Sequence, residues 1–362
     1  MTKNKTILLA AGGTGGHLFP AIAVAEELAK SQVKVHLATD HRCSKYLTEG
    51  LPLTAHIFVL HLNMSGIFNK IKSVIQLLSA CIKSIVLIRK IKPDAIIGFG
   101  GYPSFPAMAA AKILKIPMII QEQNCFLGKS NRFFAKSAKL IALSYKETGN
   151  INIGFKSKLL FTGDIVRSEI RALPEKNNFD SQEFHIFTFG GSQGAKLFST
   201  LIPDALGELQ KLNPKIKISV TQQANKEEQK YLKRYYGNIL DIKYELSDFF
   251  YNMPEIYNKT QLVIARSGAS TIAELTNIGL PAIFIPYPHA SEDHQYFNAM
   301  AVANNNASWC YRQNEVSYSI LASKINELIS DRALLKEASK QLLSRKSDGA
   351  KYLVDTVLKI IE

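Results

Sequence analysis

The sequence predicts an α/β protein made of two Rossmann-like, doubly wound domains that face one cleft. A length of 362 residues is long for one domain and ample for two. Short apolar runs alternate with helical patterns along both halves, which is typical of parallel sheets. Each half also begins with an apolar run that ends in a glycine turn, at residues 12–16 and again at residues 190–194. This repetition favours two nucleotide-type domains.

Strands are expected where apolar runs end at turn residues. In the first half these runs are 7–11, 35–39, 57–60, 95–99, 118–121 and 140–143. In the second half they are 186–189, 216–221, 239–244, 262–265 and 282–285. Helical patterns lie between them, at 21–31, 106–114, 197–210, 271–278 and 294–304.

The domain boundary is expected just before a polar, linker-like stretch at residues 173–183, which contains Pro174. The expected domains are residues 1–163 and 164–344. A last helix, at about 351–361, is apolar on one face. It either completes the second domain or returns to brace the first.

Composition narrows the classes of function. The chain carries 44 Lys and Arg against 30 Asp and Glu, and its net charge of +14 favours an anionic partner. Phosphorylated substrates, an anionic membrane and nucleic acid fit this charge, and a lysine-rich composition without functional meaning is the alternative. Four cysteines without Cys-x-x-Cys spacing indicate reduced thiols. Because Lys83, Arg89 and Lys90 interrupt the longest candidate, 74–91, no membrane-spanning helix is expected.

The first glycine turn is the strongest chemical signal. An apolar strand, Gly12-Gly13-Thr14-Gly15-Gly16 and a helix pattern that begins near Pro20 follow one another. This order presents backbone amides and a positive helix end to an anion. Leu18 replaces the last glycine of G-x-G-x-x-G, so the dinucleotide motif is incomplete. His17 is either a general base or a residue that hydrogen-bonds the backbone.

Other polar groups follow other strands. Gly100, Gly101 and Tyr102 close the strand 95–99, and the carboxyl ends of parallel strands meet at one edge of a sheet. This third turn is therefore expected to face the same cleft as the first. An amide and carboxylate cluster at 121–124 suits sugar hydroxyls, or is ordinary loop polarity.

In the second half, Arg266 follows the strand 262–265 and is positioned to meet phosphate. Glu274 lies in the next helix, where a carboxylate can bind ribose hydroxyls. His289, Asp293 and His294 match no metal-ligand spacing, and the chain has no Asp-x-Asp pair. We therefore expect neither a metal nor a cofactor.

Six motifs, in this order, resemble the MurG family: GGTGGH, GFGGYPS, EQN, GGSQGA, RSGAST-x-x-E and HxxxDHQ. The matches span residues 12–295. The resemblance implies a GT-B fold, with the closing helix, about 345–362, packed on the first domain. It implies an inverting, metal-independent hexosyltransferase that acts in peptidoglycan synthesis. Such an enzyme moves N-acetylglucosamine from UDP-N-acetylglucosamine to the C4 hydroxyl of N-acetylmuramic acid in undecaprenyl-linked lipid I. The product is lipid II, made at the cytoplasmic face of the bacterial inner membrane by a peripheral protein.

The resemblance also implies roles for single residues. His17 is the candidate base, and Gly100 and Gly101, with the adjacent Tyr102, would bind the acceptor diphosphate. The UDP-sugar would contact Thr14, Gly15, Gly16, Asn124, Arg167, Ser192, Phe250, Ala269, Ser270, Thr271, Ile272, Ala273, Glu274 and Gln295. Two positions depart from the family pattern. Asp164-Ile165 stands where Asn-Pro is common before Arg167, and Gln121 stands where a His often precedes EQN.

A basic, apolar segment at residues 67–92 suits an anionic membrane surface, or is an ordinary core-facing helix with a basic face.

Two enzymes and two non-enzymes are alternatives to the transferase. A UDP-N-acetylglucosamine 2-epimerase would not need an acceptor turn, and a nicotinamide dehydrogenase would need an acidic ribose partner, for which only Asp40 is available. A nucleic-acid-binding protein is not expected, because no known aromatic-basic motif is present. A membrane scaffold would leave the cleft residues unexplained.

Overall fold

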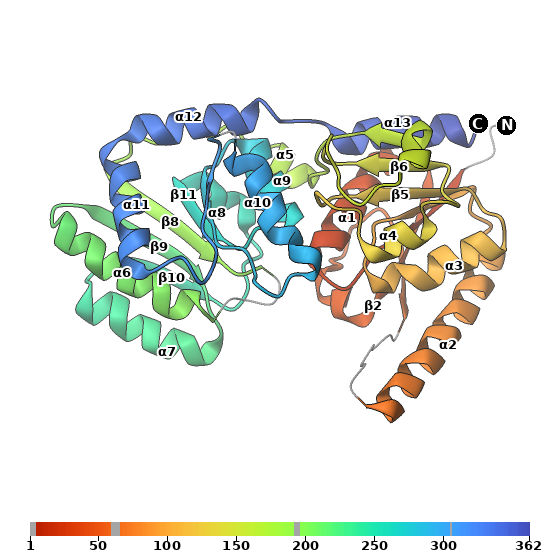
Figure 1. Ribbon diagram of the computed structural model, residues 1–362, viewed down its shortest axis with the longest axis horizontal. Helices are drawn as coiled ribbons and strands as arrows, with labels where there is room; N and C mark the ends of the chain where they lie inside the picture. Colours follow the sequence, from red (N-terminus) through yellow and green to blue (C-terminus); the bar gives the residue numbers. More distant parts are fainter. Residues whose placement is uncertain (1–4, 59–65, 192–195, 305) are drawn as a thin grey trace. The chain divides into compact units, whose positions relative to one another are not determined.

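The structure is a computed structural model and describes residues 5–58, 66–191, 196–304 and 306–362. It divides into two compact units, Met1–Ser168 with Ser347–Glu362, and Glu169–Lys346. In both units a parallel sheet lies between helices (Figure 1). The division falls after Ser168, five residues beyond the expected boundary at 163/164, and the C-terminal helix belongs to the first unit.

The first sheet has seven parallel strands in the order β3-β2-β1-β4-β5-β6-β7. The chain order reverses beside β1, which pairs with both β2 and β4. Ligands of such sheets bind where the order reverses, at the carboxyl ends of the strands. The strands are β1 (Thr6–Ala10), β2 (Lys34–Asp40), β3 (Thr54–Phe58), β4 (Ala95–Gly98), β5 (Met118–Glu122), β6 (Leu140–Leu143) and β7 (Leu159–Phe161).

Helices cover both faces of this sheet because alternate strand residues point to opposite faces. Ile7 and Leu9 of β1 belong to a core shared with α1 and α13, whereas Leu8 and Ala10 belong to a core shared with α3 and α4. The helical elements are α1 (Gly15–Lys30), η1 (His41–Tyr46), α2 (Ile67–Ile91), η2 (Tyr102–Ser104), α3 (Phe105–Ile113), α4 (Lys129–Phe134), η3 (Ile153–Lys158), and α13 (Gly349–Ile360). The short α5 (Ser168–Arg171) lies at the boundary between the units.

The second sheet has six parallel strands in the order β10-β9-β8-β11-β12-β13. They are β8 (Glu183–Phe189), β9 (Lys217–Gln223), β10 (Lys243–Ser247), β11 (Leu262–Ala265), β12 (Ala282–Phe284) and β13 (Trp309–Cys310). Its helices are α6 (Phe198–Leu212), α7 (Lys226–Arg234), η4 (Tyr235–Ile239), α8 (Met253–Lys259), α9 (Ala269–Ile278), η5 (Ser291–Asp293), α10 (His294–Ala303), α11 (Tyr318–Ser330) and α12 (Arg332–Leu343). Here too the order reverses beside the first strand, β8.

The short strands β7 and β13 were not among the expected strands, and three expected elements have clearly different bounds. The helix α1 begins at Gly15 rather than near Pro20, and the proline lies inside it, where it removes one intrahelical hydrogen bond. The expected strand 239–244 is replaced by β10 at 243–247, because the π-helical turn η4 continues α7 as far as Ile239. The strand β3 begins at Thr54, three residues before the expected start.

The helix α2 corrects the expectation that no segment is long enough to cross a membrane. Phe68–Ile91 spans 24 residues, and its most apolar 18-residue window has a mean hydropathy of 1.8. By length and composition alone this segment could span a bilayer, although helices in the cores of globular proteins also meet these criteria. Only 22% of its apolar window is buried. The three basic residues that break the apolar run in the sequence do not shorten the helix.

Candidate functional site

The first glycine turn is held by a buried carboxylate. Gly13 has a φ of +86°, which favours glycine, and its N–H donates to Asp40 Oδ1 at 3.1 Å. Asp40 ends β2, is fully buried, and pairs through Oδ2 with Arg42 at 2.6 Å. One carboxylate thus joins the ends of β1 and β2. Because Asp40 is committed to these partners, it does not suit the ribose contact of a nicotinamide dehydrogenase.

The helix α1 starts directly after this turn. Thr14 precedes the helix with an extended backbone, and its side chain makes no capping hydrogen bond. Gly15 and Gly16 form the first turn of the helix, so their amides are at its positive end. Phe19 lies over Gly15, where an added Cβ would be 2.7 Å from the ring. A larger residue at position 15 would therefore displace the Phe19 ring.

His17 has one ring nitrogen fixed by the backbone. Its Nδ1 lies 2.9 Å from the carbonyl oxygen of Phe99, the residue after β4. Because a carbonyl only accepts, Nδ1 carries the proton and Nε2 has the lone pair. The amide of Gln123 also contacts Nδ1, and rotating that amide by 180° brings its otherwise unpartnered Oε1 to this donor. The Nε2 atom is therefore the basic nitrogen of His17.

The third turn adjoins the first. Gly100 and Gly101 have φ values of +83° and +71°. A Cβ on Gly101 would lie 3.1 Å from Cδ2 of His17 and 3.2 Å from the carbonyl oxygen of Gly12. Only glycine fits both this backbone conformation and this space. The two turns predicted to bind anions are thus in contact, and the His17 ring lies against Gly101.

Tyr102 follows this turn and lies beside Arg42. The guanidinium carbon of Arg42 is 4.8 Å from the centre of the Tyr102 ring, a cation–π distance. Burial raises the pKa of the Tyr102 hydroxyl above its ordinary value, so this hydroxyl is a neutral hydrogen-bonding group. Both residues lie at the carboxyl edge of the first sheet, where the acceptor diphosphate is predicted.

The expected polar cluster at 121–124 contains three buried residues, and only Asn124 is partly exposed. Glu122 is buried and accepts hydrogen bonds from Asn124 Nδ2, Asn131 Nδ2 and Gly128 N, each at 2.9 Å. Burial raises the pKa of Glu122, and these donors oppose that shift. Gln121 is fully buried as well. Asn124 remains partly exposed, and Glu122 orients its amide.

Arg167 lies near the start of α1. Its guanidinium carbon is 4.3 Å from the centre of the Phe19 ring, the same ring that covers Gly15. The preceding loop does not need the proline that is common in the family pattern. Ser347 Oγ accepts the N–H of Asp164 at 2.8 Å, and Ile165 is buried in the core.

The glycine turn of the second unit follows β8. The N–H of Gly190 donates to Gln223 Oε1 at 3.1 Å, and Gly191 has a φ of +77°. Ser192, the predicted diphosphate contact, lies outside the described residues. Phe250 is 8% exposed, and its ring packs edge-to-face on Phe187. The Phe250 side chain thus belongs to the core, which leaves its backbone for the predicted nucleotide contact.

Arg266 is largely occupied by the protein. It is 7% exposed, its Nη1 donates to the carbonyls of Ile285 and Pro286 at 2.9 Å, and its Nη2 donates to Gln313 at 2.8 Å. Two of these hydrogen bonds brace the loop after β12, and the third reaches Gln313, which follows β13. Burial lowers the pKa of this guanidinium. A direct contact with the donor phosphate remains a prediction.

The helix α9 begins at Ala269, one residue after its N-cap Gly268. Ser270 and Thr271 are partly exposed, whereas Ala269, Ile272 and Ala273 are buried. Those three residues can reach a ligand only through their backbone.

Glu274 and Gln295 are each oriented by a neighbour. Glu274 is 5% exposed, and its Oε2 accepts the hydroxyl of Tyr257 at 2.9 Å. Gln295 Oε1 accepts the N–H of Tyr287 at 3.0 Å, so the Nε2 atom of Gln295 points the opposite way and can act as a donor. Among the residues that the structure describes, no three His, Cys, Asp or Glu side chains gather as a metal site.

Comparisons with known proteins agree with this architecture. Residues 7–143 match the glycosyltransferase family 28 N-terminal domain, and residues 185–353 match the C-terminal domain. The chain is 47% identical over 361 residues to a protein of Rickettsia bellii (strain RML369-C), covering 99% of this chain and 100% of the relative. That protein is a UDP-N-acetylglucosamine--N-acetylmuramyl-(pentapeptide) pyrophosphoryl-undecaprenol N-acetylglucosamine transferase. The chain belongs to the MurG family.

Two further MurG-type relatives support the assignment. A transferase of the same name from Rickettsia canadensis (strain McKiel) is 47% identical over 99% of this chain and 100% of the relative. The crystal structure of Acinetobacter baumannii MurG superposes with a TM-score of 0.78 at 25% identity, covering 98% of this chain and 99% of that one. The two-domain GT-B fold expected from the sequence is therefore confirmed.

In this MurG-family chain the predicted residues gather at the carboxyl edges of the two sheets. In the first unit these are the residues of the two glycine turns with Asn124 and Arg167, and in the second they are Gln295 and the start of α9. Asp40, Arg42 and Tyr257 were not predicted as site residues. Asp40 and Arg42 could have been found because Asp40 ends β2 and Arg42 follows it in η1, next to the first turn. No sequence signal links Tyr257 to Glu274.

Proposed function

We propose that this protein transfers N-acetylglucosamine from UDP-N-acetylglucosamine to lipid I, the N-acetylmuramyl-(pentapeptide) pyrophosphoryl-undecaprenol, and so forms lipid II for peptidoglycan synthesis. The observation that carries the proposal is the 47% identity, over 99% of the chain, to transferases named for this reaction. The contact between His17 and the two glycine turns supports it, because a base beside two anion-binding turns suits a diphosphate-linked acceptor.

The second unit would bind the donor. The amides at the start of α9 would meet the nucleotide, Glu274 would accept hydrogen bonds from the ribose hydroxyls, and Gln295 would donate its amide to the sugar. Ser192 would contact the donor diphosphate. Thr14, Gly15, Gly16, Asn124 and Arg167 of the first unit complete the proposed set of donor contacts.

The first unit would bind the acceptor and supply the base. Gly100, Gly101 and Tyr102 would hold the acceptor diphosphate. The C4 hydroxyl of N-acetylmuramic acid would attack the anomeric carbon of the donor, and His17 Nε2 would take the hydroxyl proton. The bond from the anomeric carbon to the UDP oxygen breaks with its electron pair on UDP, and the α-linked donor becomes a β-linked product. Backbone amides and Ser192 would stabilise the departing UDP without a metal ion.

The helix α2 supports a peripheral position on an anionic membrane. Its buried residues are Ser73, Ala80, Ser84 and Ile88, of which only Ile88 has a large apolar side chain. Its exposed residues are large and apolar, and they include Phe68, Ile71, Val74, Ile75, Leu78, Ile82 and Val86. A helix of a globular protein normally shows the reverse pattern.

Basic residues accompany this apolar surface on α2. Lys70, Lys72, Lys83, Arg89 and Lys90 are all exposed. Cationic side chains beside exposed apolar ones suit the headgroup region of an anionic bilayer. We infer that α2 docks on the cytoplasmic face of the inner membrane, where the undecaprenyl-linked acceptor is embedded.

Transfer of labelled N-acetylglucosamine to a short-chain lipid I analogue, in the presence of EDTA, tests the proposed reaction. Product formation is expected and would support metal-independent transfer at the same time. Binding of the donor without product would refute this acceptor and favour an epimerase or another acceptor. Absence of donor binding would refute the donor site.

A further inference from the structure

Tyr257 joins the helix α8 to the predicted ribose-binding carboxylate. The residue is 1% exposed, and its hydroxyl donates to Glu274 Oε2 at 2.9 Å. Its ring packs edge-to-face on Phe187 of β8, at 6.1 Å between ring centres. The packed ring fixes where the hydroxyl lies, and the hydroxyl in turn fixes one oxygen of Glu274.

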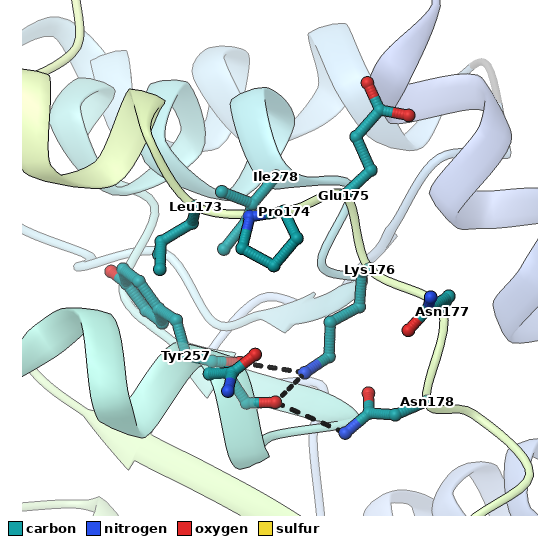
Figure 2. Close-up of a pocket in the computed structure, with 9 residues that line it drawn as sticks. Leu173, Pro174, Glu175, Lys176, Asn177, Asn178, Tyr257 and Ile278 are labelled. Atoms are coloured by element: carbon teal, nitrogen blue, oxygen red, sulfur yellow. Dashed lines mark hydrogen bonds between the residues drawn. The ribbon is translucent and has the colours of Figure 1, made fainter.

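Lys176 holds the end of the helix that carries Tyr257. Its Nζ donates to the carbonyl of Tyr257 at 2.9 Å and to the carbonyl of Asn258 at 2.5 Å (Figure 2). Asn178 Nδ2 donates to the same Asn258 carbonyl at 3.2 Å. These carbonyls lie in the last turn of α8, where helical carbonyls lack intrahelical partners and a cation is favoured.

The same residue also binds the end of α9. The backbone N–H of Lys176 donates to the carbonyl of Ile278, the last residue of that helix. Figure 2 shows Lys176, Asn178, Tyr257 and Ile278 around one small pocket. The segment 176–178 thus fastens the C-terminal ends of both α8 and α9. One of these helices carries Tyr257, and the other carries Glu274.

We propose that Tyr257 and Lys176 are positioning residues that set the Glu274 carboxylate for the ribose of the donor. The inference rests on the proposed function, because it takes Glu274 as the ribose contact. Tyr257 acts on the carboxylate directly, and Lys176 acts through the end of α8. Neither residue touches the donor. Their loss should therefore weaken recognition of the ribose hydroxyls while the uracil and diphosphate contacts remain.

The test compares the affinities of the full-length protein for UDP and for 2′,3′-dideoxy-UDP, measured by calorimetry. A hydrogen bond to a charged group is strong enough for the native protein to prefer UDP by about 10–100-fold. Glu274→Gln should abolish most of this preference. Tyr257→Phe should reduce it by about 3–10-fold, and Lys176→Met should reduce it in the same direction by a smaller factor.

Matched controls separate positioning from a general loss of stability. Tyr236→Phe removes another buried tyrosine hydroxyl in the same unit, one that is bonded to Gln222, and Lys243→Met removes an exposed lysine. Both should keep the native preference, and thermal unfolding should show every variant folded at the assay temperature. A native preference in folded Tyr257→Phe and Lys176→Met would overturn the proposal. A native preference in Glu274→Gln would instead refute Glu274 as the ribose contact, even if glycosyl transfer occurs.

Discussion

His17 Nδ1 lies 2.9 Å from the carbonyl oxygen of Phe99, and this hydrogen bond decides which nitrogen of the ring is basic. The carbonyl follows β4, whereas the histidine is the third residue of α1, so two separate elements define the protonation of one side chain. Nε2, the nitrogen with the lone pair, lies on the side of Gly101. This geometry suits a base that acts on an acceptor held by the third turn.

Replacement of His17 should affect turnover much more than donor binding. Because a positioned base contributes about 10²–10⁴-fold, His17→Ala should lower kcat by a factor in that range. The affinity for UDP-N-acetylglucosamine, measured by calorimetry, should stay within a few-fold of the native value. Native turnover in His17→Ala would exclude this residue as the base.

Gly101→Ala should impair catalysis because the new Cβ would press on the His17 ring. The φ of +71° also makes the backbone unfavourable for alanine, by roughly 1–2 kcal/mol. Gly50→Ala is the matched control, because Gly50 has a φ of +91° and open space around its Cβ position. Both variants should unfold at a lower temperature, but only Gly101→Ala should lose kcat. Equal kcat in the two variants would show that the contact with His17 has no role.

Acidic substitutions on α2 should weaken membrane binding. Leu78 and Ile82 are 59% and 63% exposed, so Leu78→Glu with Ile82→Glu should fold normally but repel an anionic surface. Cosedimentation with anionic vesicles at low salt should fall, and transfer to a vesicle-embedded acceptor should fall much more than transfer to a short-chain acceptor. Ile239→Glu, at a 61% exposed position of the other unit, is the control. Undiminished cosedimentation of the α2 variant would exclude this surface.

His185 should make folding sensitive to acid. Its ring lies between the hydroxyls of Thr221 and Thr260, and burial lowers its pKa from 6.5 to about 4. In the unfolded chain His185 therefore binds a proton below about pH 6.5, whereas in the folded chain it stays neutral until the pH reaches about 4. Stability from the neutral ring is complete above pH 6.5 and is lost as the pH falls toward 4, with a slope of up to about 1.4 kcal/mol per pH unit.

Urea unfolding between pH 7 and pH 4.5 measures this slope. His185→Gln should show a shallower loss of unfolding free energy with acid than the native protein. His289→Gln changes an exposed histidine and should keep the native slope. Identical slopes in all three proteins would mean that His185 does not couple folding to pH.

Local patterns were sufficient to predict most of the architecture. The strands near residues 7, 35, 95, 118 and 140 were found because a buried parallel strand is a continuous apolar run that ends at turn residues. The glycine turns were found because a positive φ and a close approach both require glycine. Local patterns failed at 239–244, where the π-helical turn η4 ends only at Ile239 and the strand begins at Lys243, and at the start of α1, where Pro20 lies inside the helix.

The sequence by itself determined the two α/β units and the residue types at the edges of their sheets, because these follow from short-range periodicity and backbone geometry. Only the tertiary structure decided what each polar side chain does. Glu122 is bonded to its own loop and helix α4, three N–H groups of Arg266 are bonded to other parts of the protein, and Tyr257 reaches Glu274 from another helix. The tertiary structure also leaves the apolar face of α2 exposed. Burial and hydrogen bonding between residues far apart in the chain depend on packing, which no local pattern records.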